Sequence, residues 1–156
     1  MRVAGFVALL VVFAAGVAGA QTRVVDFSQD AVGQAPKGFE FGHTAKEGRP
    51  GRWVVQAEGK EKYLAQLDDD RTRSRFPVAV LADLSLTDGD FSARFKPVSG
   101  RTDQAAGLVW RYQDENNYYI VRANALEGNV VPYKVQNGKR PPSGAMKTAR
   151  TATFAV

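Results

Sequence analysis

The stretch QAAGLVWRYQDENNYYIVRANALEGNVVPYKV, residues 104–135, decides the fold. Its large apolar side chains recur at every second position in three runs, a pattern typical of short, half-buried antiparallel strands. Polar residues at 113–117 separate the first two runs, and residues 126–128 separate the second from the third. The side chains at 113–117 bond their own backbone readily and tolerate left-handed conformations, so they can close a hairpin. The stretch therefore predicts three consecutive antiparallel strands.

The same alternation assigns each side chain to a face of the predicted sheet. The apolar face comprises Leu108, Trp110, Tyr112, Tyr119, Val121, Ala123, Val131, Tyr133 and Val135. If these residues pack into a core, the opposite face collects Arg111, Tyr118, Arg122 and Asn124. Two guanidinium groups, a phenol and an amide suit the binding of a hydroxyl-rich or anionic ligand, with Tyr118 as the platform for a sugar ring. In the alternative interpretation, Arg111 and Arg122 form cross-strand ion pairs or cover apolar surface with their stems.

The first twenty residues have the pattern of a secretory signal peptide. Arg2 supplies a positive charge, residues 5–17 are uncharged and largely apolar, and the small residues at 18–20 fit cleavage before Gln21. A spanning helix needs about 20 apolar residues, so this run is short for a membrane anchor. We predict a signal peptide at residues 1–20, a single domain at 21–156, and a secreted or periplasmic product with no membrane span after cleavage.

Composition narrows the classes of partner. The chain of 156 residues carries a formal net charge of +5, and Arg2 is the one charged residue of the segment 1–20, which leaves +4 for the remainder. Export makes nucleic acid an unsuitable partner, so the positive charge favours a carbohydrate or an envelope polysaccharide. The densest charge run, residues 68–75, mixes both signs and is interpreted as a solvated loop. The chain has no cysteine, which excludes disulfides and thiolate chemistry.

The rest of the chain also predicts strands rather than helices. The expected strands are 24–27, 53–56, 63–67, 78–81 with an extension over 83–86, 91–96, and a last one at 148–156. No segment after residue 20 combines helical periodicity with caps over a useful length. Many short strands with frequent turn signals predict an all-β fold, an antiparallel two-sheet sandwich of the jelly-roll type.

The sequence lacks the residue patterns of common catalytic and metal sites. A glycosidase needs two carboxylates that face the scissile bond, and none of the predicted central strands presents such a pair. His43 is the one histidine, and there is no Gly-x-Ser-x-Gly elbow to support a nucleophile. The acidic residues at 68–70 do not have the spacing of a calcium loop. We therefore expect no cofactor and no metal, and the catalytic residues of any enzymatic activity stay unknown.

Several segments resemble the exported concanavalin A-like, laminin-G-like jelly-roll domains of the 3-keto-disaccharide hydrolase-like family. The segments are 26–27, 36–39, 51–55, 91–96 and, most specifically, AGLVWR at 106–111 with NNYYIVRAN at 116–124. The resemblance covers about residues 24–140 and implies a two-sheet sandwich with a concave face and a glycan-related role. Family members typically continue with further strands where this chain ends, so we expect a sandwich that is truncated at its C-terminus. The alternative is a smaller, genuine sandwich whose last strand is 148–156.

Three functions follow as alternatives from these observations. The leading one is an exported, non-catalytic jelly-roll module that binds carbohydrate. The second is a glycoside or 3-keto-disaccharide hydrolase, and the third is a structural envelope protein without a small ligand.

Overall fold

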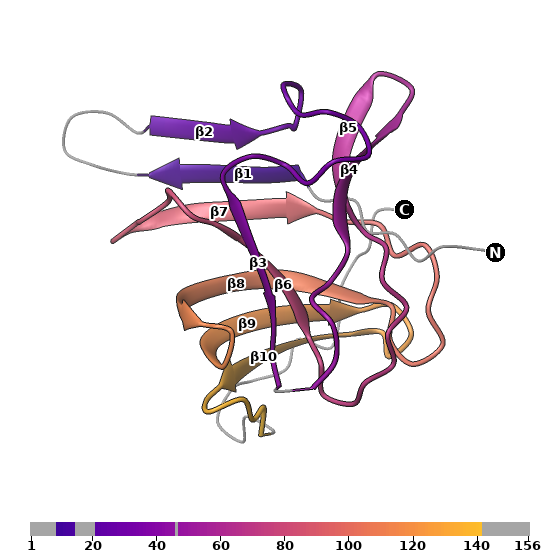
Figure 1. Cartoon of the computed structure of the whole chain (residues 1–156). Coiled ribbons are helices and arrows are strands. Elements are labelled where there is room, and N and C mark those ends of the chain that lie inside the picture. The colour runs from indigo at the N-terminus through magenta and orange to yellow at the C-terminus, as the bar shows by residue number, and fades with distance from the viewer. Residues whose placement is uncertain (1–8, 15–20, 46, 142–156) are drawn as a thin grey trace.

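The computed structural model describes residues 9–14, 21–45 and 47–141, and it is all-β (Figure 1). No helix occurs among these residues, as the sequence predicts. None of the described segments is therefore a helix of the length and apolarity needed to cross a membrane.

The strands form four small antiparallel sheets. One has the order β2-β1-β7, a second has the order β10-β9-β8, and two more are the pairs β3-β6 and β4-β5. The bounds are β1 Leu9–Ala14, β2 Gln21–Val25, β3 Phe39–His43, β4 Trp53–Glu58, β5 Glu61–Gln66, β6 Pro77–Leu81, β7 Gly89–Arg94, β8 Ala105–Asp114, β9 Asn117–Asn124 and β10 Asn129–Val135. In Figure 1 the sheet β2-β1-β7 lies at the top and β10-β9-β8 at the bottom, while β3 and β6 run steeply across them.

The segment that was expected to decide the fold forms the sheet β10-β9-β8. Its three strands pair antiparallel and in sequence order, which confirms the prediction for residues 104–135. The half-buried strand predicted around Phe91 is also confirmed, because Phe91 and Ala93 are partly buried in β7 while Ser92 and Arg94 are exposed.

Other elements differ from the prediction at their ends. The strand expected at 24–27 stops at Val25, because Phe27 has a positive φ of 58° and turns its ring into the core. The extension over 83–86 is wrong, since β6 ends at Leu81 and a turn follows. Strand β3 was not predicted at all. The strand predicted at 148–156 lies outside the described residues.

Two small clusters form the buried core. Phe27, Val55 and Leu64 make the first, which joins β4 and β5 to the loop after β2. Val78 of β6 makes the second with Tyr118 and Val135. The second cluster joins the pair β3-β6 to one face of the sheet β10-β9-β8, and thereby decides which face of that sheet points inward.

The inward face is the one that the sequence assigned to solvent. Tyr118, at 2% exposure, packs in the second cluster together with the partly buried Val109 and Ile120. Tyr133 and Val135 pair with Ile120 and Tyr118, so β10 adds its apolar residues to this face and not to the face of Tyr119. The predicted face assignment is therefore inverted for β9, and the prediction that β10 continues the apolar face of Tyr119 is wrong.

Strand β1 lies within the segment that the sequence predicts to be a signal peptide. It is the central strand of its sheet and pairs antiparallel with β2 on one side and β7 on the other. Cleavage before Gln21 stays a prediction, and it would remove this central strand.

Candidate functional site

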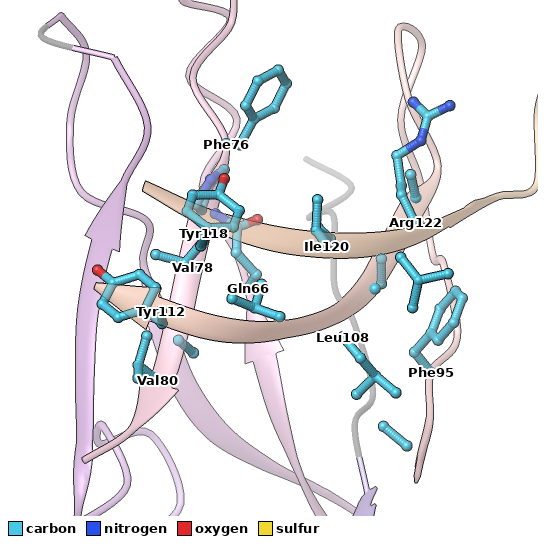
Figure 2. A pocket seen from close by; sticks show the side chains of 18 of the residues that line it. Gln66, Phe76, Val78, Val80, Phe95, Leu108, Tyr112, Tyr118, Ile120 and Arg122 are labelled. Carbon is cyan, nitrogen blue, oxygen red and sulfur yellow. The ribbon is translucent and has the colours of Figure 1, made fainter. Parts of the chain in front are cut away.

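A wide cleft lies between β7 and the sheet β10-β9-β8. Its volume is about 1990 Å³, and residues of every strand from β3 to β10 line it, together with the loops around residues 68–76 and 82–104. Figure 2 shows Tyr112 and Tyr118 at one end of the cleft, and Arg122 and Phe95 at the other. A small-molecule pocket typically measures about 300–1,000 Å³, so this cleft has room for a longer chain.

Three of the four predicted ligand residues share the inward face of β9. Tyr118, Arg122 and Asn124 are 2%, 7% and 0% exposed, and their spacing of two and four positions along a strand places them on one side. Arg122 and Tyr118 line the cleft, whereas Asn124 does not. The three residues thus lie on one face, as the alternation predicts, but that face is buried and not open to solvent.

Arg111 does not share the buried face of the other three, although it is among the residues that line the cleft. The pairing of β8 with β9 shifts register between Trp110 and Asp114, and Arg111 has a positive φ of 49°. Such a bulge redirects the side chains that follow it. Tyr112 consequently turns to the inward face, with its ring centroid 6.0 Å from that of Tyr118, while Arg111 is exposed. The prediction that Tyr112 shares a face with Trp110 is wrong for this reason.

Arg122 is held by a network of acidic and amide groups. Its guanidinium donates to Asp103 over 3.2 Å and to Glu127 over 2.5 Å, and Asn124 donates to the same oxygen of Asp103 over 2.6 Å. The pKa of Glu127 is lowered, first by the hydrogen bond from Asn129 and then by Arg122. The ion pairing that the sequence left as an alternative is therefore present for Arg122, but its acids lie in loops and not on the neighbouring strands, and no ion pair of Arg111 occurs among the described residues. Arg122 and Asn124 already have protein partners.

Tyr118 also has a protein partner. Its hydroxyl oxygen lies 2.6 Å from Oγ1 of Thr44, which is fully buried beside β3. Burial raises the pKa of Tyr118, so the phenol stays protonated at neutral pH. At 2% exposure Tyr118 presents neither a free hydroxyl nor an open ring face, so the prediction that it is the platform for a sugar ring is wrong.

Three buried donors on the cleft walls have no partner among the described residues. They are Nε1 of Trp53, Nε2 of Gln66, which is 6% exposed, and Nε of Arg122. All three residues line the cleft, and Figure 2 shows Arg122 at the end opposite Tyr112. An unpaired buried donor costs about 1–3 kcal/mol, and the terminal torsion of a glutamine turns easily. A ligand hydroxyl that received these hydrogen bonds would remove that cost.

A second guanidinium lies at the cleft between two aromatic rings. The Cζ atom of Arg140 is 4.0 Å from the ring centroid of Phe76 and 4.4 Å from that of Tyr133. Burial lowers the pKa of Arg140, and the positive charge of Arg122 lowers it further. The sequence gives no signal for this contact of Arg140, because Arg140 and Phe76 lie far apart along the chain and belong to no shared motif.

The mixed charge run at 68–75 is a loop with Asp69, Arg71 and Arg73 exposed, as the sequence predicts, but Arg75 is buried in it. The Arg75 guanidinium, 3% exposed, contacts Asp68 at 3.1 Å and Asp70 at 3.6 Å, and the more exposed Arg49 contacts the same acids. Hydrogen bonds from Thr72 hold the pKa of Asp70 far below its usual range. Ion pairs thus account for these acids, and no cluster of metal-ligating side chains occurs in the part of the chain that the structure describes.

Asp103 and Glu127 are a pair of carboxylates that no single strand encodes and that the structure brings together around Arg122, although only Asp103 lines the cleft. Asp103 and Glu127 come from the loops on either side of Arg122 and are about half exposed, at 46% and 48%. A glycosidase needs one carboxylic acid that is protonated at the working pH. The lowered pKa of Glu127 opposes that role for Glu127. His43 is no better placed as a base, since the contact of its Nδ1 is the carbonyl of Thr44 at 3.2 Å.

No family model, curated protein or solved structure matches this chain. What is established is the all-β architecture of antiparallel sheets, without an identified family.

Proposed function

We propose that the protein is an exported, non-catalytic domain of the β-sandwich, jelly-roll type that binds carbohydrate in the cleft. The observation that carries the proposal is the pairing of aromatic walls with the unpartnered donor of Gln66 in one wide, open cleft. Sugar rings stack their C–H faces on aromatic rings, while amides and guanidinium groups bind their hydroxyls.

The two ends of the cleft supply different parts of this chemistry. At one end the partly buried Tyr112 offers a ring face, and the buried Tyr118 packs behind it (Figure 2). Arg140 adds positive charge at the cleft and has no carboxylate partner among the described residues, whereas the charge of Arg122 is paired with Asp103 and Glu127. The formal net charge of the chain is also positive. An acidic polysaccharide therefore fits better than a neutral one, which supports an envelope or extracellular glycan as the partner.

The test is a glycan array that includes neutral and uronate-containing polysaccharides, probed with wild type and two variants. Gln66→Met removes the unpartnered donor at nearly constant volume and should lower affinity about tenfold, since one hydrogen bond to a ligand is worth about 1.5 kcal/mol. Gln56→Met is the matched control, because Gln56 lies on β4 outside the cleft. Binding that survives Gln66→Met unchanged, or no binding to any glycan, would contradict the proposed site.

A hydrolase is the second candidate, and the carboxylates of Asp103 and Glu127 favour it. If the two acids flank a glycosidic bond, Asp103→Asn and Glu127→Gln should each abolish turnover of a glycan that still binds. We expect no turnover by the wild type, because the lowered pKa of Glu127 leaves it without a proton to donate. Release of reducing ends from an array hit is the measurement that separates the two candidates.

A further inference from the structure

Strand β1 occupies a slot between β2 and β7. It pairs with β7 along its full length and with β2 from Leu10 to Ala14, antiparallel on both sides. Among the described residues, β2 and β7 pair with no other strand. Removal of residues 1–20 would therefore leave two strands with unpaired backbone groups facing each other across a gap one strand wide.

We propose that this slot in the processed protein binds an extended, uncharged apolar segment of another polypeptide, which replaces β1 antiparallel to both neighbours. The proposal rests on the proposed export for the cleavage that opens the slot. The mode of binding is strand addition, in which main-chain hydrogen bonds supply affinity and alternate side-chain positions supply specificity.

The strand seated in the slot shows which chemistry fits. LLVVFA contains no charge and no proline, and it is rich in residues that favour extended backbone. A proline within the segment would remove a ladder hydrogen bond in a strand that is paired on both sides. The partner segment should therefore be at least six residues long, apolar and free of proline.

The register shows which positions of the partner must be apolar. On β7, Phe91 and Ala93 are partly buried and line the cleft, while Ser92 is exposed. The backbone of Val12 is opposite Phe91, and that of Val11 is opposite Ser92. Directly opposed residues of antiparallel strands share a face. A charge at the position of Val12 should thus enter the cleft wall, and a charge at the position of Val11 should reach solvent.

The experiment starts from the full chain, cut between residues 20 and 21 by signal peptidase. The probes are fluorescent synthetic peptides of LLVVFA flanked by lysines, in the native sequence and with Val12→Lys or Val11→Lys. The native peptide should displace the cleaved fragment 1–20 and slow amide hydrogen exchange in β2 and β7. Val12→Lys should weaken binding at least tenfold, whereas Val11→Lys should change it less than about threefold.

Three results would overturn the proposal. The first is absence of peptide binding, and the second is equal affinity of the two lysine peptides. The third is that β2 and β7 stay protected from exchange after the fragment is lost, because the slot would then be filled by residues 142–156 or by a second copy of the chain. Deletion of residues 142–156 and sedimentation would tell these occupants apart. Export is tested separately by the mass of the cellular product, and a product that retains residues 1–20 would contradict it. Peptide binding can still be measured in that case, because the protein is cut in vitro.

Discussion

Tyr118 and Tyr119 are adjacent tyrosines on opposite faces of β9, and they give the sharpest test of which face is buried. Tyr118 is 2% exposed, contacts Tyr112 and forms a hydrogen bond with the buried Thr44. Tyr119 is partly exposed and stacks on Trp110 with ring centroids 5.7 Å apart. The sequence pattern alone predicts the reverse, with Tyr119 in the core.

Tyr118→Phe and Tyr119→Phe each remove only the hydroxyl group and keep the ring. Tyr118→Phe leaves Thr44 Oγ1 buried without its partner, which should lower the free energy of unfolding by about 1–3 kcal/mol. Tyr119→Phe should change it by less than about 0.5 kcal/mol, as is usual for a surface position. Truncation to alanine should increase the difference between the two positions. Tyr118→Ala removes a buried aromatic side chain and should lower the free energy of unfolding by about 3–5 kcal/mol, whereas Tyr119→Ala removes a partly exposed ring and should lower it by about 1–2 kcal/mol.

Urea denaturation followed by far-ultraviolet circular dichroism gives the four free energies, provided that the m-value is unchanged. If Tyr118→Ala does not fold, the two phenylalanine variants still give the comparison. A cost for the Tyr119 variants equal to or above that of the Tyr118 variants would show that the outer face is the core, and would refute the assignment of Tyr118 to the buried face.

Three further outcomes follow from the sequence and structure. The exported protein should lack residues 1–20 by intact mass, and retention of these residues would contradict the predicted signal peptide. Arg122→Ala should destabilise the fold by about 2–3 kcal/mol, less than for a fully buried ion pair because its two carboxylate partners are half exposed, while Arg111→Ala should have little effect. The pKa values of Asp70 and Glu127 are lower in the folded chain than in the unfolded chain, so their stabilisation is present above about pH 4 and is lost as the pH falls through the folded values. Unfolding free energies between pH 7 and pH 2 should therefore decrease, and a flat profile would contradict these hydrogen bonds and ion pairs.

The hairpins of residues 104–135 could be predicted because the residues that specify them lie close together in the sequence. Alternation with period two and turn residues such as Asp114 and Asn116 specify two adjacent antiparallel pairs without reference to the rest of the chain. In the structure Asp114 accepts hydrogen bonds from the backbone of Asn116 and from the side chain of Asn117, which confirms the mechanism expected for the turn.

The choice of the buried face could not be predicted from the same residues. Both faces of β9 carry an aromatic and an aliphatic side chain, Tyr118 with Ile120 and Tyr119 with Val121, so hydrophobicity does not separate them. The decision comes from Val78 and Thr44, which reach β9 from distant segments. The alternation of apolar and polar residues likewise does not predict the bulge at Arg111.

The missed features have similar causes. Strand β3 offers little alternation beyond Phe39 and Phe41 before Gly42, and its pairing with β6 is what makes it a strand. The position of Arg140 against Phe76 depends on the return of β10 toward the loop before β6, which no local pattern encodes.

The proposed glycan cleft and the proposed strand slot share one structural element, β7. The backbone of β7 forms one wall of the slot, while Phe91 and Ala93 from the same strand line the cleft. A β7 without a neighbour loses its ladder hydrogen bonds, and an unpaired strand holds its side chains in place less firmly. A segment bound in the slot should therefore order a wall of the cleft, and a ligand in the cleft should favour the ordered β7 that the segment needs. Because such coupling is reciprocal in free energy, each partner should raise the affinity for the other by the same factor. The proposed slot uses the backbone of β7 and the proposed cleft uses its side chains, so both sites depend on this one strand.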